Sequence, residues 1–316
     1  MHICEIIDRY KFVVTCEVDS PKGINIEEFL DKADLVKDYV DAIHIGDNQR
    51  AVMRAAPLAI CHVLKEKNIE PVMELASQYR NRLALQADLL GAAILGVENV
   101  LLTKGFNPSL GDHAEAKSVH DLDCVTLVKA AVNLTKGTDM TGHALNEAPN
   151  FCLGVAALPE REPNEAHLAE LKEKVSLGAR YIQTQPIYET EILERFLESI
   201  RDLHVPVIVG HMMLKSASMA RFIDSNLPGV TVPEKLIREL EGLPRNQLVE
   251  KSLQISVALL KKMKSLCQGV HFIPAGWEIY VPGIVQEIVG ERTPKSSHEQ
   301  DWRKDILGEE NSGRSG

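Results

Sequence analysis

The stretch FVVTCEVDSPKGINIEEFLDKADLVKDYVDAIHI (residues 12–45) decides the fold, because it holds two β-branched runs with a helical repeat between them. The runs FVVTCEV (12–18) and DAIHI (41–45) have the composition and length of buried strands. Between them, apolar side chains recur at the spacing of one helix face: Ile26, Phe29, Leu30, Ala33 and Val36. Two strands joined through a helix pair in parallel, because a parallel neighbour needs a crossover connection.

The same unit recurs along the chain. Further strands are expected at 70–75, 99–102, 151–158, 180–185, 205–212 and 269–276. Helices are expected at 25–39, 51–67, 81–96, 121–136, 164–177, 190–203, 216–268 (with breaks) and 281–289. Eight such units predict an α/β fold, a single-domain (β/α)8 TIM barrel over residues 1–290. A doubly wound open sheet is the alternative, but no GxGxxG follows the first strand and no GxxxxGK[ST] occurs.

The composition is that of an acidic globular protein. The chain has 316 residues, a formal net charge of −10 and 45% hydrophobic residues. Because phosphate binding requires clustered Lys and Arg, neither nucleic acid nor an anionic membrane is an expected partner. Residues 1–11 lack a signal-peptide run and no apolar stretch reaches the ~18 residues of a membrane span, so a cytoplasmic protein is expected. Residues 291–316 are rich in Ser, Gly and charge, which predicts a flexible tail with Trp302 solvated.

The six cysteines are scattered along the chain. They form no CxxC pair and have no histidine at zinc-finger spacing. We therefore expect reduced, mostly buried thiols and no metal or cluster site.

Functional side chains of such a barrel lie at the C-terminal ends of its strands and in the loops that follow. The polar residues at these places are Glu17, Asp47, Asn48, Glu74, Lys104, Glu160, Gln183, Gln185, His211 and Glu278. Asp47 and Asn48 are interpreted as a cap of the next helix, and His211 as a structural histidine with satisfied hydrogen bonds.

Glu17 is the most informative of these residues, because it lies inside an apolar run. An inward carboxyl there is desolvated, which raises its pKa and makes it a proton donor near neutral pH. An outward or salt-bridged glutamate is equally compatible with the pattern. Gln183 and Gln185 share a strand face, and their amides suit either the edge of a heterocycle or a hydrogen bond in the core.

Several motifs occur in an order that resembles the methylenetetrahydrofolate reductase family, most closely the branch found in acetogens. They are VVTCEVDSPKG (13–23), GDNQRAVMR (46–54), EPVMEL (70–75), RNRLALQADLLGAAILGVENVLLT (80–103), GDHAEAKSVHDLD (111–123), KVSLGARYIQTQPIY (174–188), LKSASMARFI (214–223) and GVHFIPAGWE (269–278). The resemblance covers about residues 11–288, and the motifs are specific jointly rather than singly.

The resemblance implies a flavin-dependent oxidoreductase that reduces 5,10-methylenetetrahydrofolate to 5-methyltetrahydrofolate, a step of one-carbon metabolism linked to methionine biosynthesis. In the family, hydride moves from flavin N5 to the exocyclic methylene, and a glutamate that falls on Glu17 protonates N10. The family's pterin-binding glutamine falls on Gln185. The other substrate contacts implied are Gln183, Tyr188 and Phe106.

The implied cofactor is FAD, with FMN as the alternative. Its implied contacts are Glu74, Lys104, Gly105, His120, Asp123, Glu160 and Lys174. The sequence departs from the family at several of these places. Phe106 replaces the aspartate of a basic-Gly-Asp turn, and Glu74 replaces a His or Gln. Glu170 and Glu173 stand where the family has polar and basic residues for the flavin diphosphate, and carboxylates facing a diphosphate would repel it.

The resemblance leaves the electron donor open between NAD(P)H and a partner protein. It also allows an iron–sulfur partner subunit and a homo-oligomer. Two alternatives to a flavin-dependent reductase follow from the departures. One is a diverged folate-binding subunit of a larger complex with weak or no flavin binding, and the other is a non-redox enzyme that binds methyltetrahydrofolate.

Overall fold

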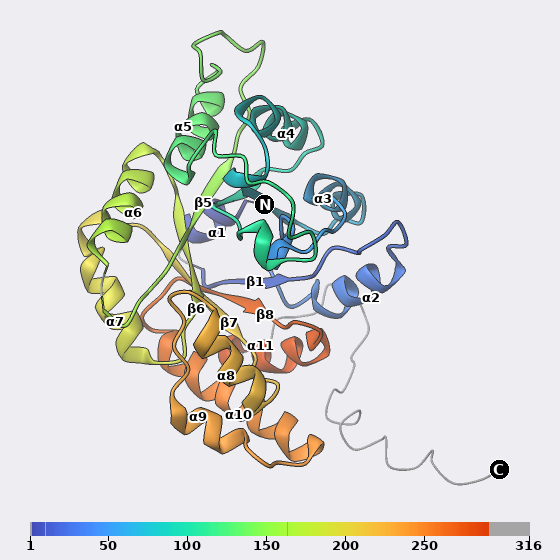
Figure 1. The fold of residues 1–316 in the computed structure, drawn as a ribbon, viewed down its shortest axis with the longest axis vertical. Helices are drawn as coiled ribbons and strands as arrows, with labels where there is room; N and C mark the ends of the chain where they lie inside the picture. The colour runs from blue at the N-terminus through green and yellow to red at the C-terminus, as the bar shows by residue number, and fades with distance from the viewer. Residues whose placement is uncertain (1, 10, 163, 291–316) are drawn as a thin grey trace, which may run out of the picture.

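Eight parallel strands close into a barrel, with helices around it (Figure 1). The computed structural model describes residues 2–9, 11–162 and 164–290, so the predicted tail with Trp302 lies outside the described residues. The strands are β1 (Val13–Glu17), β2 (Ala42–Ile45), β3 (Pro71–Ala76), β4 (Asn99–Thr103), β5 (Cys152–Ala157), β6 (Tyr181–Pro186), β7 (Val207–Met212) and β8 (Gly269–Ile273). All eight lie within or next to the predicted runs.

Closure of the barrel is visible in the pairing of its first strand. Thr15 is in register with Ala42 of β2 on one side and with His271 of β8 on the other. The predicted (β/α)8 barrel is therefore confirmed. The open sheet is excluded, because its first and last strands would not pair with each other.

Seven helices occupy predicted positions: α2 (Glu27–Val36), α3 (Pro57–Glu66), α4 (Arg82–Ile94), α5 (Cys124–Thr135), α6 (Glu165–Leu177), α7 (Thr190–Ser199) and α11 (Val281–Val289). The broken stretch 216–268 contains α8 (Ala217–Asn226), α9 (Glu234–Leu240) and α10 (Arg245–Met263). Pro233 and Pro244 directly precede α9 and α10, because proline cannot continue a helix but is compatible with its start. In the described ranges, none of the helices combines the length and apolarity that crossing a membrane demands.

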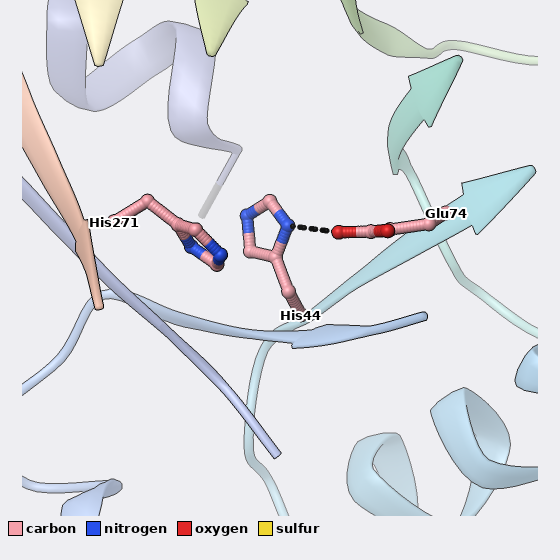
Figure 2. Close-up of side chains that lie close together, drawn as sticks. All are labelled: His44, Glu74 and His271. Atoms are coloured by element: carbon pink, nitrogen blue, oxygen red, sulfur yellow. Dashed lines mark hydrogen bonds and ion pairs between the residues drawn. The ribbon is translucent and has the colours of Figure 1, made fainter. Parts of the chain in front are cut away.

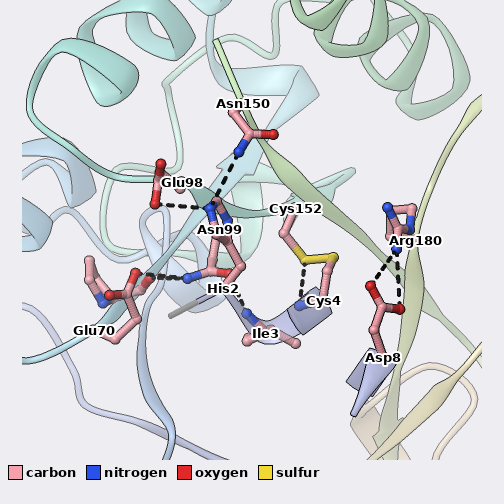
Figure 3. Close-up of a disulfide and its surroundings, with 11 residues drawn as sticks. His2, Ile3, Cys4, Asp8, Glu70, Glu98, Asn99, Asn150, Cys152 and Arg180 are labelled. Atoms are coloured by element: carbon pink, nitrogen blue, oxygen red, sulfur yellow. Dashed lines mark hydrogen bonds and ion pairs between the residues drawn. A yellow bond between two sulfur atoms is a disulfide. The ribbon is translucent and has the colours of Figure 1, made fainter. Parts of the chain in front are cut away.

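One helix was not predicted. α1 (Ile3–Asp8) lies across the N-terminal ends of the strands, where Ile3 and Cys4 pack against the inward side chains of Val13 and Tyr181. The backbone N–H of Ile3 donates to the side-chain oxygen of Asn99 at 2.8 Å (Figure 3). This end of the barrel is therefore filled by apolar side chains.

A disulfide joins Cys4 of α1 to Cys152 of β5 (Figure 3). The expectation of reduced thiols is wrong for this pair, which is separated by 148 residues in the sequence. The pairing depends on α1 lying under the barrel, which spacing along the chain does not indicate. Cys16, Cys61, Cys124 and Cys267 are free and buried, as expected.

Gly154 of β5 makes room for a large side chain inside the barrel. A Cβ atom at this position would lie 2.2 Å from the ring of Tyr181, which is fully buried. The ring and a side chain at position 154 cannot occupy the same space. The glycine therefore determines how side chains pack in the barrel interior near the N-terminal ends of the strands.

We expect Gly154→Ala to lower the free energy of unfolding by about 1–3 kcal/mol, because the Tyr181 ring must move out of a close-packed site. Gly23→Ala is the matched control, since a Cβ there meets nothing within 4 Å. Its effect should stay within about 0.5 kcal/mol. Urea denaturation of both variants measures the difference, and equal effects would contradict the packing described.

Candidate active site

A cavity of about 1240 Å³ lies at the C-terminal ends of the strands. Its lining includes the last residues of five strands: Glu17, Thr103, Ala157, Met212 and Ile273. The loops after the strands and residues of α6 complete the wall. This is the end of a (β/α)8 barrel at which active sites occur.

Glu17 ends β1 and points into this cavity. Val14 and Cys16 of the same strand pack in the outer core, and alternation along a strand places Thr15 and Glu17 on the inner face. Burial raises the pKa of Glu17 to about 8, with further contributions from the charges of Glu74 and Asp19. Of the two orientations that the sequence left open, inward and outward, the structure therefore shows the inward one. With a pKa of about 8, the carboxyl is mostly protonated near pH 7.

Behind Glu17, three side chains meet inside the barrel: His44 of β2, Glu74 of β3 and His271 of β8 (Figure 2). His44 Nδ1 lies 3.1 Å from Glu74 Oε1, and the centroids of the two imidazole rings are 4.3 Å apart. Burial lowers the pKa of His44 to about 3 and that of His271 well below its usual range. Burial, followed by the charge of Asp47, raises the pKa of Glu74 to about 7.

His44 and His271 are not among the residues expected at the site, because both lie inside strands rather than at strand ends or in loops. A signal was present in both strands. AIHI (42–45) and GVHFI (269–273) each carry one histidine within an otherwise apolar run, at a position that alternation turns inward.

Gln183 and Gln185 both line the cavity, as expected from their two-residue spacing on β6. Gln183 is buried, and its Oε1 has no hydrogen-bond partner among the described residues. A buried amide oxygen without a partner is costly unless a ligand or water supplies a donor. The two amides are thus available to a polar ligand.

The wall formed by α6 carries an ion pair and a contact between a histidine and a carboxylate. Lys174 is 7% exposed and its Nζ lies 2.5 Å from Glu170 Oε1, while His167 Nδ1 lies 3.3 Å from Glu160 Oε2. All four residues line the cavity. Glu173 does not line it and is exposed, so only one of the two helix carboxylates expected to face a diphosphate does so.

The turn after β4 is held by a tyrosine. The hydroxyl of Tyr79 donates to the carbonyl oxygen of Phe106 at 2.8 Å and accepts from its N–H at 2.9 Å. Gly105 has a φ of +85°, which favours glycine. Lys104, Gly105 and Phe106 line the cavity, as does the exposed His120.

Four expected residues lie elsewhere or act differently. Tyr188 is buried away from the cavity, and its hydroxyl donates to the carbonyl of Met212 at 2.8 Å. Asp123 does not line the cavity and is the N-cap of α5. His211 faces the outer layer. Neither of its ring nitrogens has a hydrogen-bond partner among the described residues, so the expectation of satisfied hydrogen bonds is wrong. Asp47 accepts from the N–H of Ala76 at 2.9 Å and pairs with Arg80, rather than capping a helix.

Fold and cavity define a (β/α)8 barrel with an inward carboxyl of raised pKa in a large cavity at the C-terminal ends of the strands. The chain belongs to the methylenetetrahydrofolate reductase family, because the model of that family matches residues 2–288. The resemblance inferred from the motifs is thereby confirmed. The acetogen branch within the family stays a prediction.

The individual relatives are distant. Methylenetetrahydrofolate reductase 2 of Schizosaccharomyces pombe is 28% identical over 199 residues, which is 56% of this chain and 28% of the relative. Methylenetetrahydrofolate reductase (NADH) 1 of Arabidopsis thaliana is 26% identical over 221 residues, or 66% of this chain and 36% of the relative. The chain therefore spans about a third of the length of these two proteins.

Solved structures share the fold. An uncharacterized protein from Clostridium thermocellum, which binds two copies of 5-methyl-5,6,7,8-tetrahydrofolic acid, matches with a TM-score of 0.60 at 17% identity. The match covers 90% of this chain and 97% of that one. A 2,3-dimethylmalate lyase matches with a TM-score of 0.53 at 9% identity, covering 98% and 94% of the two chains.

The charges of the cavity test whether its residues fit the flavin implied by the family. On the α6 wall, the Lys174 ammonium is paired with Glu170, and the carboxylates of Glu160 and Glu170 line the cavity. At the other end of the implied site, Glu74 is hydrogen-bonded to His44. The residues of the α6 wall therefore do not fit a flavin diphosphate held in the family manner.

We expect Glu170→Gln to tighten FAD binding about tenfold, because it releases the Lys174 ammonium for a phosphate oxygen. Glu173→Gln is the matched control on the same helix, since Glu173 lies outside the cavity. Quenching of flavin fluorescence during titration gives the dissociation constants. Wild-type protein that is purified with one equivalent of FAD would contradict the poor fit.

Proposed function

We propose that this chain binds 5,10-methylenetetrahydrofolate in the cavity and catalyses its reduction to 5-methyltetrahydrofolate, with Glu17 as the general acid. The observation that carries the proposal is that Glu17 points into the cavity, where desolvation raises its pKa to about 8. A carboxyl with this pKa holds its proton at pH 7 and can donate it to an amine nitrogen. Membership of the family supports the substrate, and so does the structurally similar folate-binding protein.

The reaction begins with the transfer of the Glu17 proton to N10 of the substrate. The bond between N10 and the bridging methylene breaks, and an iminium forms at N5. A hydride then adds to the methylene carbon and gives the 5-methyl group. The proton from Glu17 and one hydride together account for the product. The hydride comes from a reduced nicotinamide bound in the same cavity or from a donor held by a partner chain.

The two glutamines orient the pterin ring in this proposal. Gln183 and Gln185 project from one strand into the cavity that also contains Glu17. Each amide offers a donor and an acceptor, which match the alternating nitrogen and carbonyl groups along the edge of a pterin. The unpartnered Oε1 of Gln183 supports this role.

A second candidate is a non-redox enzyme that binds methyltetrahydrofolate. The Lys174–Glu170 ion pair on α6 favours it, because it weakens the case for a bound redox cofactor. Binding of 5-methyltetrahydrofolate without any methyltetrahydrofolate formation or nicotinamide oxidation would identify this function. A stable complex with a second protein, needed for turnover, would identify the subunit alternative.

We expect Glu17→Gln to lower the rate of 5-methyltetrahydrofolate formation by about 10²–10⁴-fold, because glutamine keeps the shape of the side chain but cannot donate the proton. The assay uses 5,10-methylenetetrahydrofolate with NADH, with and without added FAD. Binding of 5-methyltetrahydrofolate, measured by calorimetry, should be nearly unchanged. Glu173→Gln serves as a control carboxylate outside the cavity, and a rate loss of similar size in both variants would refute the role of Glu17.

The pH dependence follows from the same group. Because the acid acts in its protonated form, kcat/KM should be level below pH 8 and should fall about tenfold per pH unit above it. In Glu17→Gln the residual rate should lack this decrease. A wild-type profile that falls with a midpoint near 4.5, the ordinary value for Glu, would show that Glu17 is not the acid.

A further inference from the structure

Three potential metal ligands converge from strands that are far apart in the sequence. His44, Glu74 and His271 project from β2, β3 and β8 into the interior of the barrel, with the His44 ring between the other two (Figure 2). Each offers one ligand atom, and these atoms lie within 4.8 Å of one another. We propose that the three side chains, the His44–Glu74–His271 site, bind a divalent transition-metal ion.

The donor set indicates the class of ion. Two imidazoles and one carboxylate bind Zn²⁺ in hydrolytic enzymes and Fe²⁺ in non-haem iron enzymes. Ca²⁺ and Mg²⁺ are disfavoured, because they select oxygen ligands. The three residues belong to no short-spaced motif, so in the sequence only the inward-turned histidines of the two strands point to the site.

The distances are close to those of a coordinated ion. Two ligands bonded to Zn²⁺ at ~2.0–2.2 Å lie about 3.3 Å apart in a tetrahedron. His44 Nδ1 and Glu74 Oε1 are 3.1 Å apart, so this pair needs little rearrangement. The His271 ligand atom lies within 4.8 Å of both, so its approach requires at most roughly 1.5 Å of movement.

The surroundings orient one ligand and leave the other incompletely bonded. Thr15 Oγ1 lies 2.9 Å from His271 Nδ1, which fixes the ring and leaves its second nitrogen for an ion. His44 is fully buried, and its Nδ1, which faces Glu74, is the nitrogen offered to the ion, while its Nε2 has no partner among the described residues. The three converging ligand atoms, not the open Nε2, are what indicate an ion.

The site also has access to solvent and space for a further ligand. Glu74 and His271 line the cavity beside Glu17, so an ion can enter from the mouth. Three protein ligands leave at least one coordination position for water or a substrate atom, as in catalytic metal sites. The open coordination position would face the cavity into which Glu17 points.

Metal titration of the full chain tests this inference. After treatment with a chelator and dialysis, the protein is titrated with Zn²⁺ by calorimetry and, without oxygen, with Fe²⁺. We expect one equivalent of at least one ion to bind to wild type. Glu74→Gln and His271→Gln should each weaken binding by more than about 100-fold. Circular dichroism establishes that both variants are folded.

Two further variants separate this site from general binding to histidines. His167→Gln removes a histidine from the wall of the same cavity and should leave the affinity unchanged. Thr15→Val removes only the hydrogen bond to His271 and should weaken binding by about 10–100-fold. X-ray absorption on metal-loaded wild type should show two imidazoles, which does not depend on any variant folding.

Either of two results would overturn the inference. One is the absence of stoichiometric Zn²⁺ or Fe²⁺ binding to wild type, in which case the three residues form a hydrogen-bonded polar core. The other is binding that Glu74→Gln and His271→Gln leave unchanged. Both results concern the metal alone, so they leave the folate assay of Glu17→Gln independent.

Discussion

The site depends on burial of carboxyl groups inside a closed barrel. Closure of the barrel encloses the inner faces of all the strands. Because side chains alternate along a strand, every second side chain points into this enclosed interior. Glu17 and Glu74 lose hydration there, which raises the pKa of each, and the nearby His44 remains neutral for the same reason. Acid chemistry at neutral pH and a neutral metal ligand thus have one physical origin.

The two ends of the barrel differ: the N-terminal end is filled by packed side chains, and the C-terminal end contains the candidate active site. At the N-terminal end, α1 and the Tyr181 ring fill the interior, and Gly154 provides the space that the ring needs. At the C-terminal end, the inner face changes to polar residues and the cavity begins. Well-packed apolar residues below the cavity hold the strand ends in place, so the positions of Glu17 and Gln183 do not depend on mobile loops.

Charge pairing explains how the cavity departs from its family. Lys174 is buried where a phosphate-binding cation is expected, but Glu170 neutralises it within the same helix. Glu74, at an implied flavin contact, is instead hydrogen-bonded to His44. The part of the cavity proposed to bind folate carries Glu17 and the two glutamines, while the α6 wall carries a buried lysine paired with a carboxylate. The departures from the family pattern thus lie on the side of the implied cofactor.

The sequence determined the eight strand-helix units, because hydrophobic periodicity is a local property, and it identified Glu17 as the unusual polar residue of its strand. Resemblance placed Tyr188 and Asp123 at the site, but local hydrogen bonds to Met212 and to the start of α5 engage them elsewhere. Only the tertiary structure decided that Glu17 points inward, that Cys4 meets Cys152, and that His271 joins His44 and Glu74. The His271 contact depends on closure between the first and last strands, and the disulfide depends on α1 lying under the barrel. Both bring together residues that no pattern along the chain connects.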